Sequence, residues 1–177
     1  MRDFVSSVTA EYLRYKNLGE HAIAQLEDSE LNAADPGDNS IAVIVWHIAG
    51  NFESRFTDFQ TSDGEKPWRR RDDEFLGRAV THAELREKWD RGWDAAISAL
   101  NQLNDADLRR TVMIRRQPLQ IQEALHRSLA HASYHIGQIV YIAKSIRGSA
   151  WKCLTIPVGG SEAYNANPTR ERPAARA

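Results

Sequence analysis

Residues 118–148 read PLQIQEALHRSLAHASYHIGQIVYIAKSIRG, a long run of apolar residues at helical spacing. Pro118 stands just before this run, where proline suits the start of a helix, and Gly148 follows it as a typical helix stop. Four polar residues recur inside the run at steps of three and four, so they share one face of the predicted helix. They are Ser128, His131, His135 and Gln138. A polar stripe on an otherwise apolar helix predicts a hydrated or ligand-binding cavity.

Three further segments have the apolar spacing of an amphipathic helix. The first covers residues 3 to about 27, and the second begins after Ser40, a typical N-cap residue. The third opens at Thr81 and Glu84, which have the spacing of a capping box. The residues that define the three apolar faces are Val5, Val8, Tyr12, Tyr15, Leu18, Ile23 and Leu26; Ile41, Val45, Ile48, Phe52 and Phe59; and Leu85, Trp89, Trp93, Ile97 and Leu100.

The segments between these helices carry turn and loop signals. Residues 28–39 contain the breaker Asp-Pro-Gly-Asp, and residues 61–77 form a charged loop. Residues 108–117 are rich in β-branched residues and arginine, which predicts a brief extended segment or loop. Four helical patterns without a substantial strand pattern predict an all-α fold, an up-down four-helix bundle with long connections.

The length of 177 residues is that of one domain. We expect residues 1–164 to form the helical bundle. Residues 165–177 lack enough apolar side chains to build a core, so we expect a flexible C-terminal tail there.

Charge and composition exclude several classes of function. Lys and Arg total 23 and Asp and Glu total 24, a net charge of -1, which argues against nucleic acid or an acidic membrane as the main partner. No apolar run is long enough to span a bilayer, and the start of the sequence has no signal-peptide core. The lone Cys153, which we expect to be a small buried side chain, fits a reducing compartment. These features predict a cytoplasmic protein.

The histidines are the most informative residues. A four-residue step places His131 and His135 on one helix face, with Cβ atoms ~5–6 Å apart, so two ring nitrogens can converge on one metal ion. His47 lies in the most hydrophobic run of the chain, where a charged imidazole is costly unless it is paired or bound to a metal. If the second and fourth helices face the same interior, His47 completes a three-histidine set. The competing interpretations are a hydrogen-bonded core histidine at position 47 and a solvent-facing pair at 131 and 135.

Three neighbouring polar residues are candidates for catalysis or substrate binding. Asn51 lies one turn after His47 and is a candidate for orienting water or a ligand imidazole. Arg55 follows at the next turn, and its planar fork suits a carboxylate. Gln138 lies three residues after His135. Each also has a structural interpretation, as a helix hydrogen bond or an interhelical salt bridge.

The charged loop allows two interpretations. Its cations could clamp an anionic substrate over the metal, or they could be neutralised by the acids that flank them, which we favour. The cations and the aromatic residue among them are Lys66, Trp68, Arg69, Arg70 and Arg71, and the acids are Asp63, Glu65, Asp72, Asp73 and Glu74.

Several local strings, together with the order of one histidine early in the second helix and His-x3-His in the fourth, resemble the DinB superfamily of four-helix bundles. The strings are WHIAGN at 46–51, SRFTDF at 54–59, DGEKPW at 63–68, HIGQIVY at 135–141 and WKCLTIP at 151–157. The resemblance covers about residues 4–165. It implies a divalent metal ion, commonly zinc or nickel, held by His47, His131 and His135. It also implies a relationship to enzymes that depend on thiols, namely bacillithiol transferases and mycothiol-dependent maleylpyruvate isomerase.

Three neutral histidine ligands leave a metal ion with an open coordination position, which is the catalytic arrangement. Two activities follow: hydrolysis by an activated water, or transfer of a low-molecular-weight thiol that binds as co-substrate. Our leading hypothesis is therefore a metal-dependent thiol transferase or small-molecule hydrolase. The alternatives are a non-catalytic bundle that binds metal or a small ligand in stress or detoxification, and a helical interaction protein without metal. A homodimer is compatible with each of them.

Overall fold

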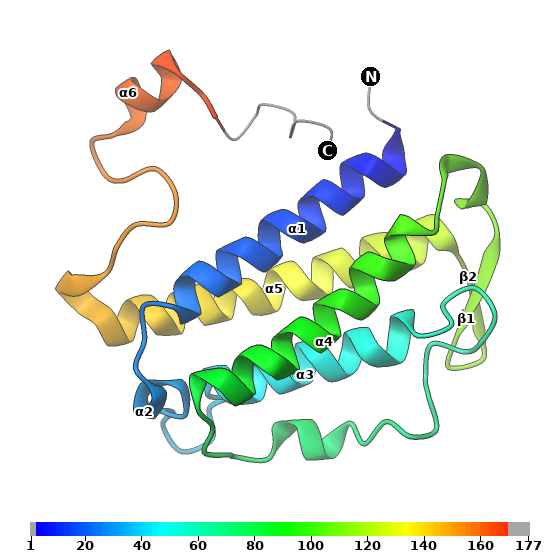
Figure 1. Cartoon of the computed structure of the whole chain (residues 1–177), viewed down its shortest axis with the longest axis horizontal. Helices are drawn as coiled ribbons and strands as arrows, with labels where there is room; N and C mark the ends of the chain where they lie inside the picture. Colours follow the sequence, from blue (N-terminus) through cyan, green and yellow to red (C-terminus); the bar gives the residue numbers. More distant parts are fainter. Residues whose placement is uncertain (1–2, 170–177) are drawn as a thin grey trace.

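The computed structural model describes residues 3–169, which are mostly helical with a small two-stranded sheet (Figure 1). The long helices are α1 (Phe4–Ile23), α3 (Ile41–Phe56), α4 (His82–Asn101) and α5 (Ile121–Arg147). The shorter elements are α2 (Asp28–Leu31), η1 (Asp72–Phe75), η2 (Asp105–Asp107), β1 (Thr111–Ile114), β2 (Gln117–Gln120), η3 (Gly148–Ala150) and α6 (Ser161–Ala166). The prediction of a helical fold is therefore confirmed. The small two-stranded sheet was not part of that prediction.

Side chains at the N-termini explain where the helices begin. Ser40 accepts a hydrogen bond from the backbone N–H of Val43 at the start of α3. Thr81 and Glu84 form the expected capping box at the start of α4. These bonds satisfy amide groups that have no partner within the helix. The predicted second helix is shorter than expected, because α3 ends at Phe56 and Phe59 lies beyond it.

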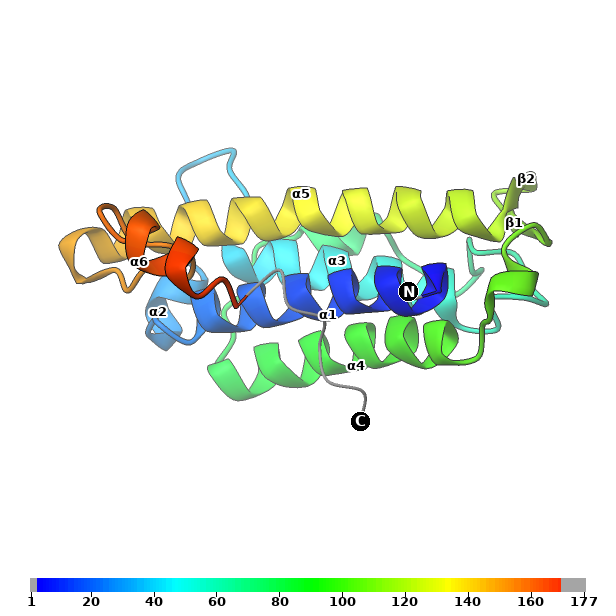
Figure 2. The same cartoon turned by 90° about the horizontal axis from the view of Figure 1, so that it is seen from above.

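Each long helix packs against two others: α1 and α3 both contact α4 and α5 (Figure 2). The backbone N–H groups of Phe4 and Val5, at the start of α1, donate to Asp105, just after the end of α4. The N–H of His82, at the start of α4, donates to Asp28, beyond the end of α1. These bonds show that α1 and α4 run in opposite directions.

The predicted up-down order is wrong at one step, because α3 and α4 run in the same direction (Figure 1). The 16-residue α3 is about 24 Å long at ~1.5 Å per residue, whereas an extended chain advances ~3.3 Å per residue. Residues 57–81 are therefore long enough to return along α3 before α4 begins. Gly92 permits a close approach of the two helices, since a Cβ atom there would lie 2.5 Å from the Cα of Ala49.

The core between the long helices is aromatic. Tyr12 and Trp93 are fully buried, with ring centroids 6.4 Å apart at nearly perpendicular planes, and Phe52 packs edge-on against Trp93. The hydroxyl of Tyr12 donates to the carbonyl oxygen of Leu125 at 3.0 Å, so α1 and α5 are joined by a polar contact inside an apolar core. Trp89 is also buried, which confirms that the two tryptophans of α4 are core residues.

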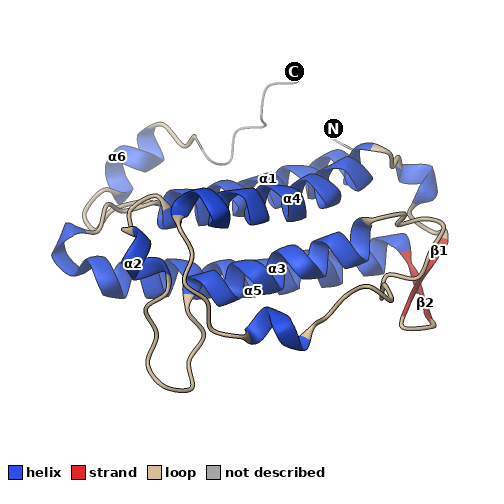
Figure 3. Cartoon of the chain, turned by 60° about the horizontal axis from the view of Figure 1, so that its bottom comes forward, coloured by secondary structure: helices blue, strands red, loops and turns tan. Residues whose placement is uncertain are grey.

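The predicted extended segment is a β-hairpin at one end of the helices (Figure 3). Strands β1 and β2 pair antiparallel, and the turn between them places Arg115 and Arg116 at positive φ. Asp63, in the long connection, accepts hydrogen bonds from the backbone N–H groups of both arginines at 2.8 and 2.7 Å. Pro118 lies within β2, so α5 begins three residues later than the proline signal indicates.

The remaining segments give three further results. Cys153 is exposed, so the expectation of a buried side chain is wrong; it lies after α5, outside the packed helices. Of the expected tail, residues 165 and 166 end α6, and residues 170–177 lie outside the described part of the chain. Among the described residues, no helix has the length and apolarity needed to cross a membrane.

Candidate metal centre

Three histidines from two helices meet between α3 and α5. Nε2 of His131 lies 3.1 Å from Nε2 of His47 and 3.2 Å from Nε2 of His135. Candidate ligand atoms of all three rings lie within 4.8 Å of one another. His47 is buried and the other two are half-buried, so the cluster is close to the surface. The structure thus brings together the three residues that the sequence singled out.

Outward-facing hydrogen bonds orient two of the three rings. Nδ1 of His47 lies 2.9 Å from a carboxylate oxygen of Glu74, and Nδ1 of His135 lies 2.7 Å from the side-chain carbonyl oxygen of Gln138. Both oxygens can only accept, so both Nδ1 atoms carry the proton. In a neutral ring the other nitrogen then has a free lone pair, which leaves both Nε2 atoms as acceptors directed at His131.

This proton arrangement fits a cation between the rings. His131 can donate from Nε2 to only one neighbour, so at least one of the two short N–N contacts joins nitrogens without a proton between them. Separations of 3.1 and 3.2 Å are also close to the ~3.3 Å expected between ligands of a tetrahedral ion at bonds of ~2.0–2.1 Å. The three histidines could therefore hold a divalent metal ion.

The titration behaviour of the rings agrees with this role. Burial, followed by the neighbouring His135 and His47, lowers the pKa of His131 to about 4. Burial also lowers the pKa of His135, partly opposed by the hydrogen bond to Gln138. Neutral imidazole is the form that binds metals, so these two rings are available as ligands at neutral pH.

Glu74 connects the cluster to the charged loop. Its carboxylate accepts two hydrogen bonds from Arg69, at 2.8 and 2.9 Å, besides the bond to His47. Burial opposes ionisation of Glu74, but these bonds outweigh it and lower its pKa. Gly50, one turn after His47, leaves the space that the carboxylate fills, since a Cβ atom there would lie 2.4 Å from Glu74. This role of Glu74 was not predicted from the sequence, in which Glu74 is one of the acids of the charged loop. Gly50, a glycine inside a helix, is a local sign of the space that the carboxylate fills.

The three candidate catalytic residues do not all lie in the same cavity. Asn51 and Arg55 line a cavity of about 190 Å³ that also includes His47 and His131. Arg55 donates to the carbonyl oxygen of Gly64 and to the carboxylate of Glu65. Both partners lie in the connection after α3, so Arg55 forms an ion pair with a loop residue rather than between two helices. Gln138 does not line this cavity and instead orients His135.

The charged loop is largely self-neutralised, as the favoured interpretation expected. Arg69 pairs with Glu74, while the more exposed Arg70 and Arg71 lie 3.9 and 3.6 Å from the carboxylates of Asp73 and Asp72. Arg69 and Arg71 nevertheless line the cavity beside the histidines.

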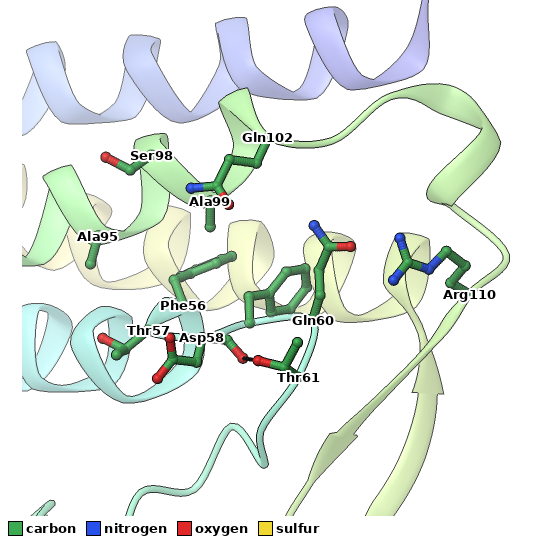
Figure 4. Close-up of a pocket in the computed structure, with 11 residues that line it drawn as sticks. Phe56, Thr57, Asp58, Gln60, Thr61, Ala95, Ser98, Ala99, Gln102 and Arg110 are labelled. Carbon is green, nitrogen blue, oxygen red and sulfur yellow. Dashed lines mark hydrogen bonds between the residues drawn. The ribbon is translucent and has the colours of Figure 1, made fainter.

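A second cavity lies at the C-terminal ends of α3 and α4 (Figure 4). Its volume is about 470 Å³, and Phe56 and Phe59 line both cavities. Its lining has polar side chains, such as Ser98, Gln102 and Arg110, but it contains neither histidine nor cysteine. The three-histidine cavity is therefore the better candidate for a functional site.

Comparison with known families matches residues 1–160 to a family model described as a protein of unknown function, DUF1572. The chain belongs to the DUF1572 family. Its fold is similar to the crystal structure of a conserved protein from Enterococcus faecalis, with a TM-score of 0.64 and 18% identity over 84% of this chain and 100% of that one. At that identity the similarity concerns the fold alone. No curated protein is significantly similar in sequence.

Proposed function

We propose that this DUF1572 protein is a metal-dependent enzyme with a DinB-type four-helix bundle, acting on a small molecule. His47, His131 and His135 hold a zinc or nickel ion in this proposal. The reaction is transfer of a low-molecular-weight thiol or hydrolysis. The observation that carries the proposal is the convergence of three Nε2 atoms, two of them kept free of protons by Glu74 and Gln138.

The surroundings of the cluster support catalysis over a closed structural site. Structural zinc sites have four protein ligands, whereas among the described residues only three histidines are grouped closely enough to share an ion. A cavity opens directly on His47 and His131, which gives a small molecule access to the cluster. A divalent ion there supplies Lewis acidity, which activates a water molecule or a thiol for attack.

The residues of the chain have three tasks in this scheme. Glu74 and Gln138 hold the rings of His47 and His135 in position. Asn51 lines the cavity one helical turn from His47, where its amide can hydrogen-bond to a water or a substrate. Phe75 packs against the ring of His47, with centroids 4.7 Å apart, and shields that side of the cluster from water.

The metal content of the untagged protein, purified without chelator, tests the first half of the proposal. We expect about one divalent ion per chain in the wild type and less than a tenth of that in His47→Ala, His131→Ala and His135→Ala. His21→Ala, which removes an exposed histidine of α1, is the matched control and should keep the full metal content. Equal metal content in all five proteins would overturn the three-histidine site.

Enzymatic turnover tests the second half of the proposal, the reaction that the protein catalyses. The metal-loaded protein is assayed against a panel of small electrophiles and esters, with and without a low-molecular-weight thiol. Activity that requires the thiol identifies a transferase, and activity without it identifies a hydrolase. If the metal is bound but neither activity appears, the non-catalytic metal-binding alternative replaces the enzyme.

A further inference from the structure

The cavity beside the histidines has an unusual lining. Five arginines border it, and no aspartate or glutamate is among its lining residues. The arginines are Arg55, Arg69, Arg71, Arg115 and Arg127. Such a concentration of guanidinium groups creates a positive potential that attracts anions.

Carboxylates outside the lining neutralise part of this charge. Glu65 pairs with both Arg55 and Arg115, at 3.1 and 2.9 Å, so one carboxylate serves two guanidinium groups. Arg69 pairs with Glu74, and Arg71 lies 3.6 Å from the carboxylate of Asp72. Three carboxylates thus face four of the five guanidinium groups. Arg127 is exposed and makes no ion pair with any residue that the structure describes. The cavity thus keeps an excess of positive charge, which a divalent ion on the histidines would increase.

Buried polar atoms without a partner gather in the same place. Among the described side chains, four buried nitrogen or oxygen atoms lack a hydrogen bond, and three of them belong to residues that line this cavity. The three are Nη1 of Arg69, Oγ of Ser128 and Nδ1 of His131. Leaving a buried polar atom unpaired costs about 1–3 kcal/mol, so a cluster of them indicates that a bound molecule supplies their partners.

Arg69 shows this most clearly. Its side chain is only 2% exposed, and two of its nitrogens are engaged by Glu74. The third, Nη1, lies 4.0 Å from the carboxylate of Glu65, beyond hydrogen-bond distance. Glu74 therefore holds the guanidinium in place while one donor remains available.

We propose that this cavity binds the oxyanion group of a small anionic substrate, a carboxylate or a phosphate, beside the three histidines. Nη1 of Arg69 and the hydroxyl of Ser128 donate hydrogen bonds to it, and Arg127 supplies the unpaired charge. A volume of about 190 Å³ fits a small organic anion. The inference rests on the proposed function, because it names the substrate class of the same site.

Calorimetric titration of the full-length protein tests this binding directly, without an enzymatic readout. The probes are succinate, inorganic phosphate and succinamide, the neutral diamide of the same shape as succinate. We expect one or both anions to bind at millimolar or lower concentration and succinamide to bind at least tenfold more weakly. The anion that binds more tightly distinguishes a carboxylate from a phosphate substrate.

Two charge-matched variants locate the site. Arg127→Gln removes the unpaired guanidinium, and we expect it to weaken anion binding about tenfold. Arg109→Gln removes an exposed arginine that does not line the cavity and should bind the anion as the wild type does. Ser128→Ala tests the buried hydroxyl and should also weaken binding.

The outcomes separate this inference from the proposed function. Absence of anion binding, or equal weakening in Arg127→Gln and Arg109→Gln, overturns the anion site even if the metal content is as expected. Anion binding that persists after chelation, and is weakened in Arg127→Gln but not in Arg109→Gln, supports the site even if the protein proves to hold no metal.

Discussion

Single residues decide which nitrogens of the histidines are free to bind an ion. Gln138 is the clearest case, because its carbonyl oxygen accepts the Nδ1 proton of His135 and so leaves Nε2 as an acceptor. Glu74 does the same for His47. The two partners come from different contexts: Gln138 lies one turn away on the same helix, and Glu74 comes from the long connection.

We predict that Gln138→Ala weakens metal binding about tenfold, the lower end of the range for partners of metal-ligating histidines. The ring of His135 loses the acceptor that holds its orientation and tautomer. Competition with a metal-binding dye measures the dissociation constant. Gln122→Ala, on the same helix but outside the cluster, is the control and should bind metal normally.

Gln138→Glu provides a second comparison, since it keeps an acceptor oxygen near Nδ1. It should restore metal binding to within a few-fold of the wild type. Equal affinities for the wild type and Gln138→Ala would show that the hydrogen bond to His135 has no role in metal binding.

At the scale of the elements, hydrogen bonds to the carboxylate of Asp63 fix the first part of the connection between α3 and α4. Asp63 accepts from the backbone N–H of Glu65 at 2.7 Å and from both arginines of the hairpin turn. The N–H of Gly64 donates to the carbonyl oxygen of Met113 in β1. These bonds place Glu65, and with it Arg55 and Arg115, at the rim of the arginine-lined cavity.

We predict that Asp63→Ala loosens the hairpin turn, with amide exchange of Arg115 and Arg116 roughly three- to tenfold faster at neutral pH, as expected for loss of a hydrogen bond. Hydrogen exchange followed by mass spectrometry measures this. Asp94→Asn, an exposed position on α4, should leave the turn unchanged.

The effect of Asp63→Ala on amide exchange should also depend on pH. Hydrogen bonds from the backbone of Glu65 and Arg116 hold the pKa of Asp63 below its usual range. A carboxyl group whose pKa is lower in the folded state stabilises the fold above its unfolded pKa of ~3.9, and this contribution is lost as the pH falls through the folded value. The difference between the wild type and Asp63→Ala should therefore shrink below about pH 4, and a constant difference would contradict the role of the carboxylate.

For the whole molecule, the three histidines connect elements that are distant in sequence. His47 lies on α3, whereas His131 and His135 lie on α5, and those two helices are in contact. An ion bound by all three joins the two helices and binds the folded chain in preference to the unfolded one, so it should raise the stability of the entire fold.

We predict that zinc at a free concentration 100 times its dissociation constant stabilises the protein by about 2.7 kcal/mol. For a domain of this size that corresponds to a rise in melting temperature of roughly 5–10 °C. Differential scanning calorimetry measures the shift. His131→Ala should show no shift under the same conditions, and a similar rise in that variant would mean that zinc stabilises the protein from another site.

Much of this architecture follows from local sequence. Periodicity located all four long helices, and the Ser40 and Thr81–Glu84 caps begin α3 and α4 as expected. The pairing of His131 with His135 is equally local, because residues four apart on a helix face the same side whatever surrounds them. Such features depend on neighbours within one or two turns, so they can be read from the chain.

The remaining features depend on contacts between distant segments. Local periodicity does not encode the direction in which residues 57–81 return, and it is this return that makes α3 and α4 parallel. The same connection places Glu74 beside His47 and Arg69 in the lining of the cavity. Arg127, from α5, lines the same cavity. Only the packing of the helices brings these charges together. The histidine pair and the nearby Gln138 were therefore evident from the sequence, while the bond between Glu74 and His47 and the arginine-lined cavity required the tertiary structure.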